Sequence, residues 1–272
     1  PAPTDGARRG AAAKGRIRHR VCHDGAMARP DAERDDVLRI RPLILTLAII
    51  GVAMPLLGIV LDLLIRLGGN DSGFLDGIRN LTFPDAEGNV FAWYSTIILA
   101  AVAVAFFLIA LTAHGAGRPI WRFVVLGALA LAMSADEAAY LHERLDIFAD
   151  ELGLRSDFVY KWLLLGIPLA IVAGVLVLWI ARRLDRDLRR RLIWAGIVFL
   201  AGAVGNEILG SMLKKLDTGL EGAAMTIAYD VQVFIEESLE ILGAVLALRA
   251  VLLYPRISNG PEGLAFTLPP ER

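Results

Sequence analysis

Long blocks of apolar residues recur along this chain and are separated by short polar segments. The hydrocarbon core of a bilayer is about 30 Å thick, so an α-helix crosses it in about 20 residues. Such helices satisfy their own backbone polar groups in lipid. Six blocks are predicted to span a membrane, at about residues 43–65, 91–112, 120–140, 160–181, 192–213 and 228–254. The pattern predicts an all-α fold, a polytopic integral membrane helix bundle with about six transmembrane helices.

The segments around these blocks are polar. Residues 1–37 are predicted to be a disordered basic lead, and the part before Met27 has a second interpretation, as sequence upstream of a true start at Met27. Residues 38–256 form the six-span membrane domain, in which residues 68–89 are a loop rich in turn-forming Gly, Asn, Asp and Pro. The helical pattern of the third block continues to about Leu152, and residues 257–272 are predicted to be a disordered C-terminal tail.

Composition agrees with a membrane protein. Hydrophobic residues make up 56% of the 272 residues, whereas soluble domains are about 45–50% apolar. The net charge of −1 gives no electrostatic signal for a nucleic-acid partner. The lipid bilayer is therefore the predicted partner, and the oligomeric state is left open.

The distribution of arginine predicts the orientation. Residues 181–191, between the fourth and fifth blocks, contain six arginines, and short loops rich in Lys and Arg stay on the cytoplasmic side. With six spans, both termini are then cytoplasmic. We expect a multi-pass protein of the cell membrane, and the Ala-, Arg-, Gly- and Leu-rich composition is compatible with a bacterial inner membrane.

Acidic residues interrupt three of the blocks. An acid near the middle of a span costs about 2.5–3.5 kcal/mol on insertion scales, so several acids need compensation. The predicted topology brings them to a similar depth, towards the outer face. They are Asp136, Glu137 and Glu143 on the third helix, Glu207 on the fifth, and Glu236, Glu237 and Glu240 on the sixth.

The central parts of the spans contain no Lys or Arg, which leaves shared protons or bound metal ions as compensation. Carboxylates with an imidazole suit divalent Fe, Mn or Zn. The predicted ligands are Asp136, His142, Glu143, Glu207, Glu236 and Glu240. A metal-bound water would attack an apolar or lipid-derived substrate, with Glu137 or Glu237 as the general base.

Two other functions use the same acids. One is a cation or proton transporter, and the other is a scaffold subunit in which the acids fix the register of the helices. Transporters often contain helices broken at mid-depth, and the third and sixth blocks have no Gly or Pro break, which favours a fixed metal site. The pattern departs from that of di-iron carboxylate proteins, because Ala139 occupies the position three residues before His142 where they have Glu.

Overall fold

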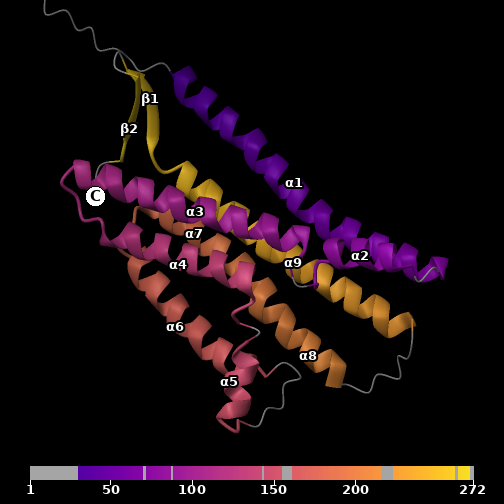
Figure 1. The fold of residues 1–272 in the computed structure, drawn as a ribbon. Coiled ribbons are helices and arrows are strands. Elements are labelled where there is room, and N and C mark those ends of the chain that lie inside the picture. The colour runs from indigo at the N-terminus through magenta and orange to yellow at the C-terminus, as the bar shows by residue number, and fades with distance from the viewer. Residues whose placement is uncertain are drawn as a thin grey trace, which may run out of the picture.

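A computed structural model describes residues 30–69, 72–86, 88–142, 144–154, 161–215, 223–260 and 263–269. Helices dominate these residues, which confirms the predicted all-α class (Figure 1). The elements in chain order are α1 (Pro30–Gly68), α2 (Gly73–Thr82), α3 (Val90–Gly115), α4 (Trp121–Ala139), α5 (Leu145–Glu151), α6 (Leu163–Ala181), α7 (Arg186–Leu200), the π-helical segment η1 (Ala201–Asn206), α8 (Glu207–Lys215), α9 (Ala223–Leu252), β1 (Arg256–Gly260) and β2 (Gly263–Thr267).

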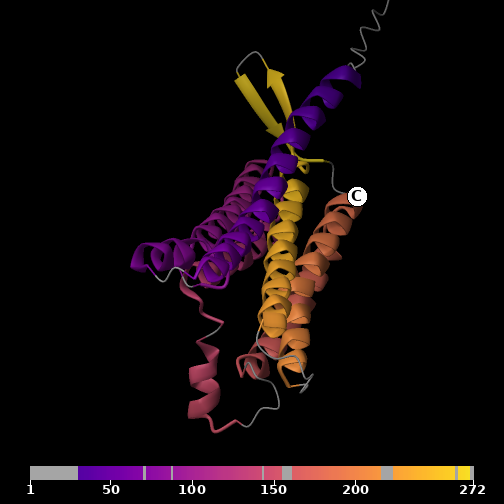
Figure 2. The same ribbon diagram turned by 90° about the vertical axis from the view of Figure 1, so that its right-hand side faces the viewer.

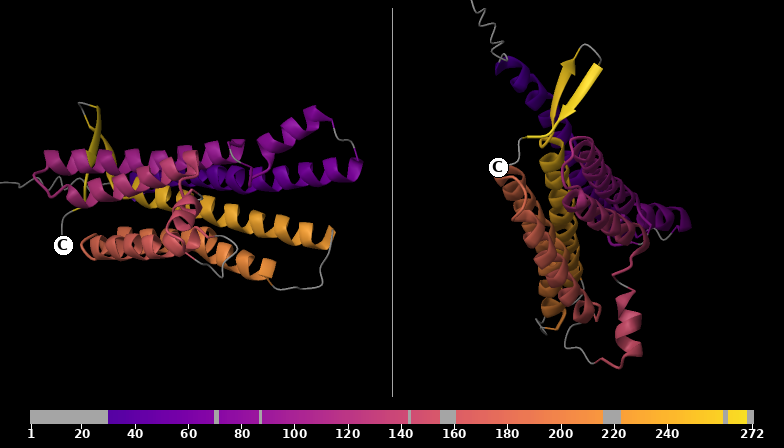
Figure 3. Two further views of the ribbon diagram at one scale, coloured as in Figure 1. Left: turned by 60° about the horizontal axis from the view of Figure 1, so that its bottom comes forward. Right: turned by 90° about the vertical axis from the view of Figure 1, so that its left-hand side faces the viewer.

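Helix α9 is the centre of the bundle. It packs against α1 and α3 on one side and against α7 and η1 on the other. Figure 3 shows α9 between a layer of α1, α3 and α4 and a second layer of α6, α7 and α8. The acids of α9 therefore face neighbours from both layers.

Apolar side chains cover much of the outside of this bundle. On α6, for example, Leu169 and Val172 are 62% and 65% exposed. Water would not favour such a surface, whereas lipid tails would. The exposed apolar faces agree with a multi-pass membrane protein.

Among the described residues, four helices are long and apolar enough to cross a membrane: Ile40–Gly68, Val90–Gly115, Leu163–Ala181 and Arg186–Met212. The other two predicted spans form α4 and α9, which pack within the same bundle. They are less apolar because they carry acids and an arginine each, Arg122 and Arg249. A count of six spans therefore stays a prediction.

The third predicted helix is shorter than expected. Helix α4 ends at Ala139, and Tyr140 follows in the left-handed region with φ of 51°. The prediction of one helix to about Leu152 is wrong, because the chain turns here and continues as the separate helix α5. Figure 2 shows α5 standing away from the bundle.

Regular structure also occurs in three segments that were expected to lack it. The predicted loop 68–89 contains α2, and residues 30–37 of the predicted disordered lead form the start of α1. The predicted disordered tail contains the antiparallel hairpin β1–β2, in which Arg256 pairs with Thr267. Residues 30–37 are mostly polar, and α2 and the hairpin are too short to form an apolar block, so a search for long apolar blocks does not reveal them.

Candidate carboxyl site

The helix that carries Glu207 changes its geometry just before this residue. Helix α7 passes into the π-helical segment η1, which ends at Asn206, and α8 begins with Glu207. Such π-helical turns are rare and are frequently found at functional sites. Gly202 of η1 lies against α9, since a Cβ atom there would be 2.8 Å from the carbonyl oxygen of Glu236. This close approach brings Glu207 next to α9.

The carboxyl groups of Glu207 and Glu236 lie close enough for their charges to interact. Two ionised carboxylates can only accept hydrogen bonds, so a direct bond between the two groups would require a proton on one of them. Asn206 supports the pair, because its Nδ2 donates to Oε2 of Glu236 at 3.3 Å and to the carbonyl oxygen of Gln232 at 2.9 Å. The side chains of adjacent residues, Asn206 and Glu207, thus meet the same residue of α9.

Three further acids lie within electrostatic range of this pair. Glu240 lies near Glu137, Glu236, Glu207 and Asp136, and Glu237 lies near Glu240 and Glu137. These neighbours are all negatively charged when ionised, and they come from α4, α8 and α9. We call Glu137, Glu207, Glu236, Glu237 and Glu240 the carboxyl cluster.

Asp136 and His142 are held together in the turn that follows α4. The backbone N–H of His142 donates to Oδ1 of Asp136 at 2.7 Å, and its Nδ1 lies 2.8 Å from Oδ2. The imidazole ring meets Trp162 edge-on, with 5.0 Å between the ring centroids. Both oxygens of Asp136 thus contact His142.

The prediction of a metal site at these residues stays untested. Within the described ranges, no group of three or more His, Cys, Asp or Glu side chains is arranged to hold a metal ion. Glu143, one of the predicted ligands, lies outside those ranges. Binding of Fe, Mn or Zn by the remaining ligands stays a prediction.

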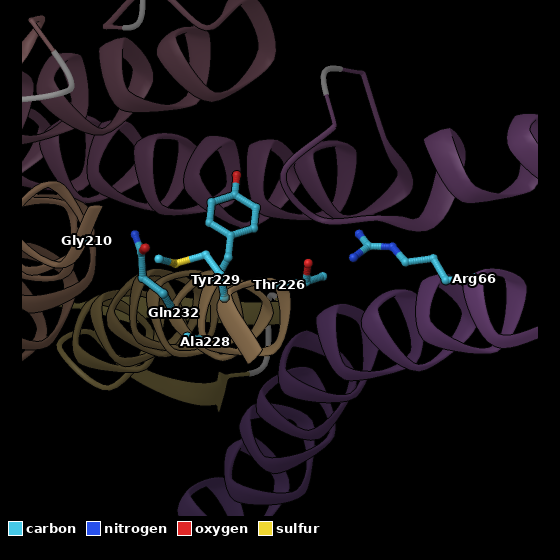
Figure 4. Close-up of a pocket in the computed structure, with 7 residues that line it drawn as sticks. Arg66, Gly210, Thr226, Ala228, Tyr229 and Gln232 are labelled. Atoms are coloured by element: carbon cyan, nitrogen blue, oxygen red, sulfur yellow. The ribbon is translucent and has the colours of Figure 1, made fainter. Parts of the chain in front are cut away.

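A pocket of about 370 Å³ lies beside the cluster, between α1, α8 and the first turns of α9 (Figure 4). It is lined by Arg66, Gly210, Met225, Thr226, Ala228, Tyr229 and Gln232. Gln232 packs so closely on Gly210 that a Cβ atom there would be 2.2 Å from its Nε2. Because the carbonyl of Gln232 shares the Asn206 amide with Glu236, the pocket is adjacent to the carboxyl cluster.

An ion-pair network closes the same end of the bundle. Asp62 of α1 is fully buried and accepts a hydrogen bond from Nε of Arg79 in α2. Nη2 of Arg66 lies 2.5 Å from Oδ2 of Asp62 and 4.0 Å from Oδ1 of Asp230. The two arginines therefore balance the two aspartates. Sequence reasoning did not predict this network, although the spacing of Asp62 and Arg66, one helical turn apart, is a usable signal.

Comparison with known proteins gives a family and no function. The family described as "Domain of unknown function (DUF8692)" matches residues 43–254. No curated protein and no solved structure matches the chain.

Proposed function

The chain belongs to this family, DUF8692, and we propose that it is an integral membrane protein that carries protons through its carboxyl cluster, as a proton-coupled transporter. The observation that carries the proposal is the juxtaposition of Glu207 and Glu236, which the close approach of Gly202 to α9 and the Asn206–Glu236 hydrogen bond bring about. Two neighbouring carboxyl groups can share one proton, and a shared proton can be taken up and released.

The surroundings of the pair support movement of that proton. Glu240 interacts with both members of the pair, and Glu237 interacts with Glu240, so acids continue along α9 from the pair. On the other side, Asn206 and Gln232 connect the pair to the pocket beside Arg66. A solute or water in this pocket would exchange protons with the pair by way of Gln232 and Asn206.

The π-helical segment η1 favours a transporter rather than a protein with a fixed metal site. Transporters often place their ion sites where a membrane helix departs from regular α geometry. The sequence shows no Gly or Pro break in the third and sixth spans, but the structure departs from α geometry in the fifth, directly before Glu207. A shift of η1 between π and α geometry would move Glu207 relative to Glu236.

A metal-dependent membrane enzyme is the second candidate. It is favoured by the Asp136–His142 pair, because a carboxylate commonly orients the imidazole of a metal ligand in this way. In this function, His142 and nearby carboxylates would hold Fe, Mn or Zn for attack on an apolar or lipid-derived substrate. Elemental analysis separates the two candidates, since an enzyme of this kind would contain stoichiometric metal that His142→Ala removes.

Proton flux into liposomes tests the transport function. Purified protein is reconstituted with a pH-sensitive dye inside the vesicles, and a potassium diffusion potential drives protons. We expect flux above that of empty liposomes, and its loss in Glu207→Gln and Glu236→Gln, which remove the ionisable groups but keep similar shapes. Glu151→Gln is the matched control, because Glu151 is an exposed acid on α5. Equal flux in all variants would contradict the proposal, as would wild-type flux no greater than that of empty vesicles.

A further inference from the structure

The opposite end of the bundle contains a larger pocket of about 850 Å³, where α6 ends and α7 and the hairpin begin. Among the described residues that line it, seven are arginines and two are aspartates, an excess of five positive charges. They come from segments far apart in the sequence, namely Arg122 in α4, residues 182–191, and Arg256 after α9. The fold therefore brings these arginines together around one pocket.

Aromatic and polar contacts fix the walls of this pocket. The guanidinium of Arg183 stacks on Trp179, 4.7 Å from the ring centroid, and lies 5.6 Å from that of Trp121. The hydroxyl of Tyr254 donates to Oδ2 of Asp185 at 2.9 Å. One of the two acids is thereby already engaged, and the guanidinium of Arg183 is held by packing before any ligand binds.

Helix α7 adds to the positive potential. It begins at Arg186, a lining residue, and its N-cap Asp185 makes no side-chain capping hydrogen bond. The first N–H groups of a helix carry a partial positive charge and favour anions. Arg186 and Arg190 are one turn apart and both exposed, so they lie on the same face at this helix end.

We infer that this pocket binds an anion that carries two or more phosphate groups. The arginine fork matches phosphate oxygens in a bidentate manner, and an excess of five charges exceeds what a single phosphate would neutralise. The positive-inside rule alone requires arginines on this side of the membrane but no pocket. Two sources have this chemistry: the head group of a diphosphate lipid, which basic pockets between helices can bind, and a soluble phosphate compound.

Titration with inorganic pyrophosphate tests the site. Binding to the full chain in neutral detergent is followed by tryptophan fluorescence, since Trp121 and Trp179 lie beside Arg183. We expect saturable binding in the wild type and an affinity about tenfold or more weaker in Arg186→Gln/Arg190→Gln, equivalent to at least one lost charged contact. The more conservative Arg186→Lys/Arg190→Lys variant keeps the charge but loses the fork, so we expect an intermediate affinity.

The matched control is Arg41→Gln/Arg189→Gln. It removes the same charge on the same predicted side, and neither residue lines the pocket. We expect its pyrophosphate affinity to equal that of the wild type. Equal weakening in both Gln double variants would overturn the inference, because it would show that pyrophosphate is attracted to surface charge in general. The absence of saturable binding in the wild type would also overturn it.

Nanodiscs distinguish the two sources. The same titration is made in phosphatidylcholine alone and in phosphatidylcholine with a diphosphate lipid. Weaker apparent binding of pyrophosphate in the second composition, with the effect lost in Arg186→Gln/Arg190→Gln, supports the site with a lipid head group as ligand. Unchanged binding supports the site with a soluble phosphate compound as ligand.

Discussion

The contact between α7 and α9 helps to position the carboxyl pair, and Gly243 lies at a close approach of these two helices. A Cβ atom at Gly243 would lie 2.6 Å from Cβ and N of Phe199 and 2.7 Å from its Cα. Ordinary contacts begin at 3.4 Å, so Gly243→Ala must move α7 and α9 apart by about 0.8 Å or strain both, which costs ~1–3 kcal/mol. Two of the three atoms belong to the backbone, which cannot rotate away as a side chain would.

We expect Gly243→Ala to lower the melting temperature by several degrees, because ~1 kcal/mol corresponds to about 2–4 °C in a domain of 150–250 residues. Melting is followed by tryptophan fluorescence in one detergent at one pH. The control is Gly196→Ala in α7, where a Cβ atom would meet nothing within 4 Å. Alanine is favoured over glycine within a helix by ~0.5–1 kcal/mol, so this control should be at least as stable as the wild type. The reasoning is refuted if Gly243→Ala melts at or above the wild-type temperature.

Three further predictions concern other contacts. The side chain of Asn89 accepts a hydrogen bond from the Ala92 N–H at 2.7 Å, which caps α3, and its amide donates to carbonyls of the preceding loop. Asn89→Ala should therefore lower the free energy of unfolding by ~1–3 kcal/mol, measured in a thermal melt. A wild-type melting temperature would contradict this. Asp62→Ala leaves two arginines without their buried partner and should cost ~1–3 kcal/mol, because both arginines are about one-third exposed and stay in contact with solvent. The double variant Asp62→Ala/Arg79→Ala should recover part of the loss, and no recovery would show that the pair is not coupled. Burial, together with the hydrogen bond to Asp185, raises the pKa of Tyr254. Its contribution to stability is therefore present below the ordinary tyrosine pKa of about 10 and is lost as pH rises above it, so the wild type should lose stability above that pH more steeply than Tyr254→Phe; parallel pH profiles would contradict this.

The hydrophobic pattern predicted the long helices well because each depends mainly on its own apolar composition. The predicted fourth span, about residues 160–181, appears as Leu163–Ala181. The turn after α4 could not be predicted in the same way, because it depends on Asp136 accepting hydrogen bonds from His142 six residues later. The chain reverses at Tyr140, which adopts the left-handed conformation. This conformation is uncommon for a residue other than glycine, so the sequence does not suggest a turn there.

The acids themselves could be found in the sequence, since charged residues within an apolar block are rare. The sequence did not predict which of these acids lie next to one another. A regular helix of 100° per residue describes neither η1 nor its effect on Glu207. The buried network of Asp62 depends on Arg79, which comes from α2 in a segment predicted as a loop. Contacts between distant segments decide such sites, and a single sequence carries no direct signal for them.

Infrared spectroscopy of the purified protein tests most directly whether Glu207 and Glu236 share a proton. A protonated carboxyl group has a C=O stretch that is separate from the bands of carboxylates, and it shifts when exchangeable protons are replaced by deuterium. We predict such a band at neutral pH in the wild type and in Glu151→Gln, with reduced intensity or altered frequency in Glu207→Gln and Glu236→Gln. A wild-type spectrum without this band, or one that both cluster variants leave unchanged, would contradict the account of a shared proton in the carboxyl cluster.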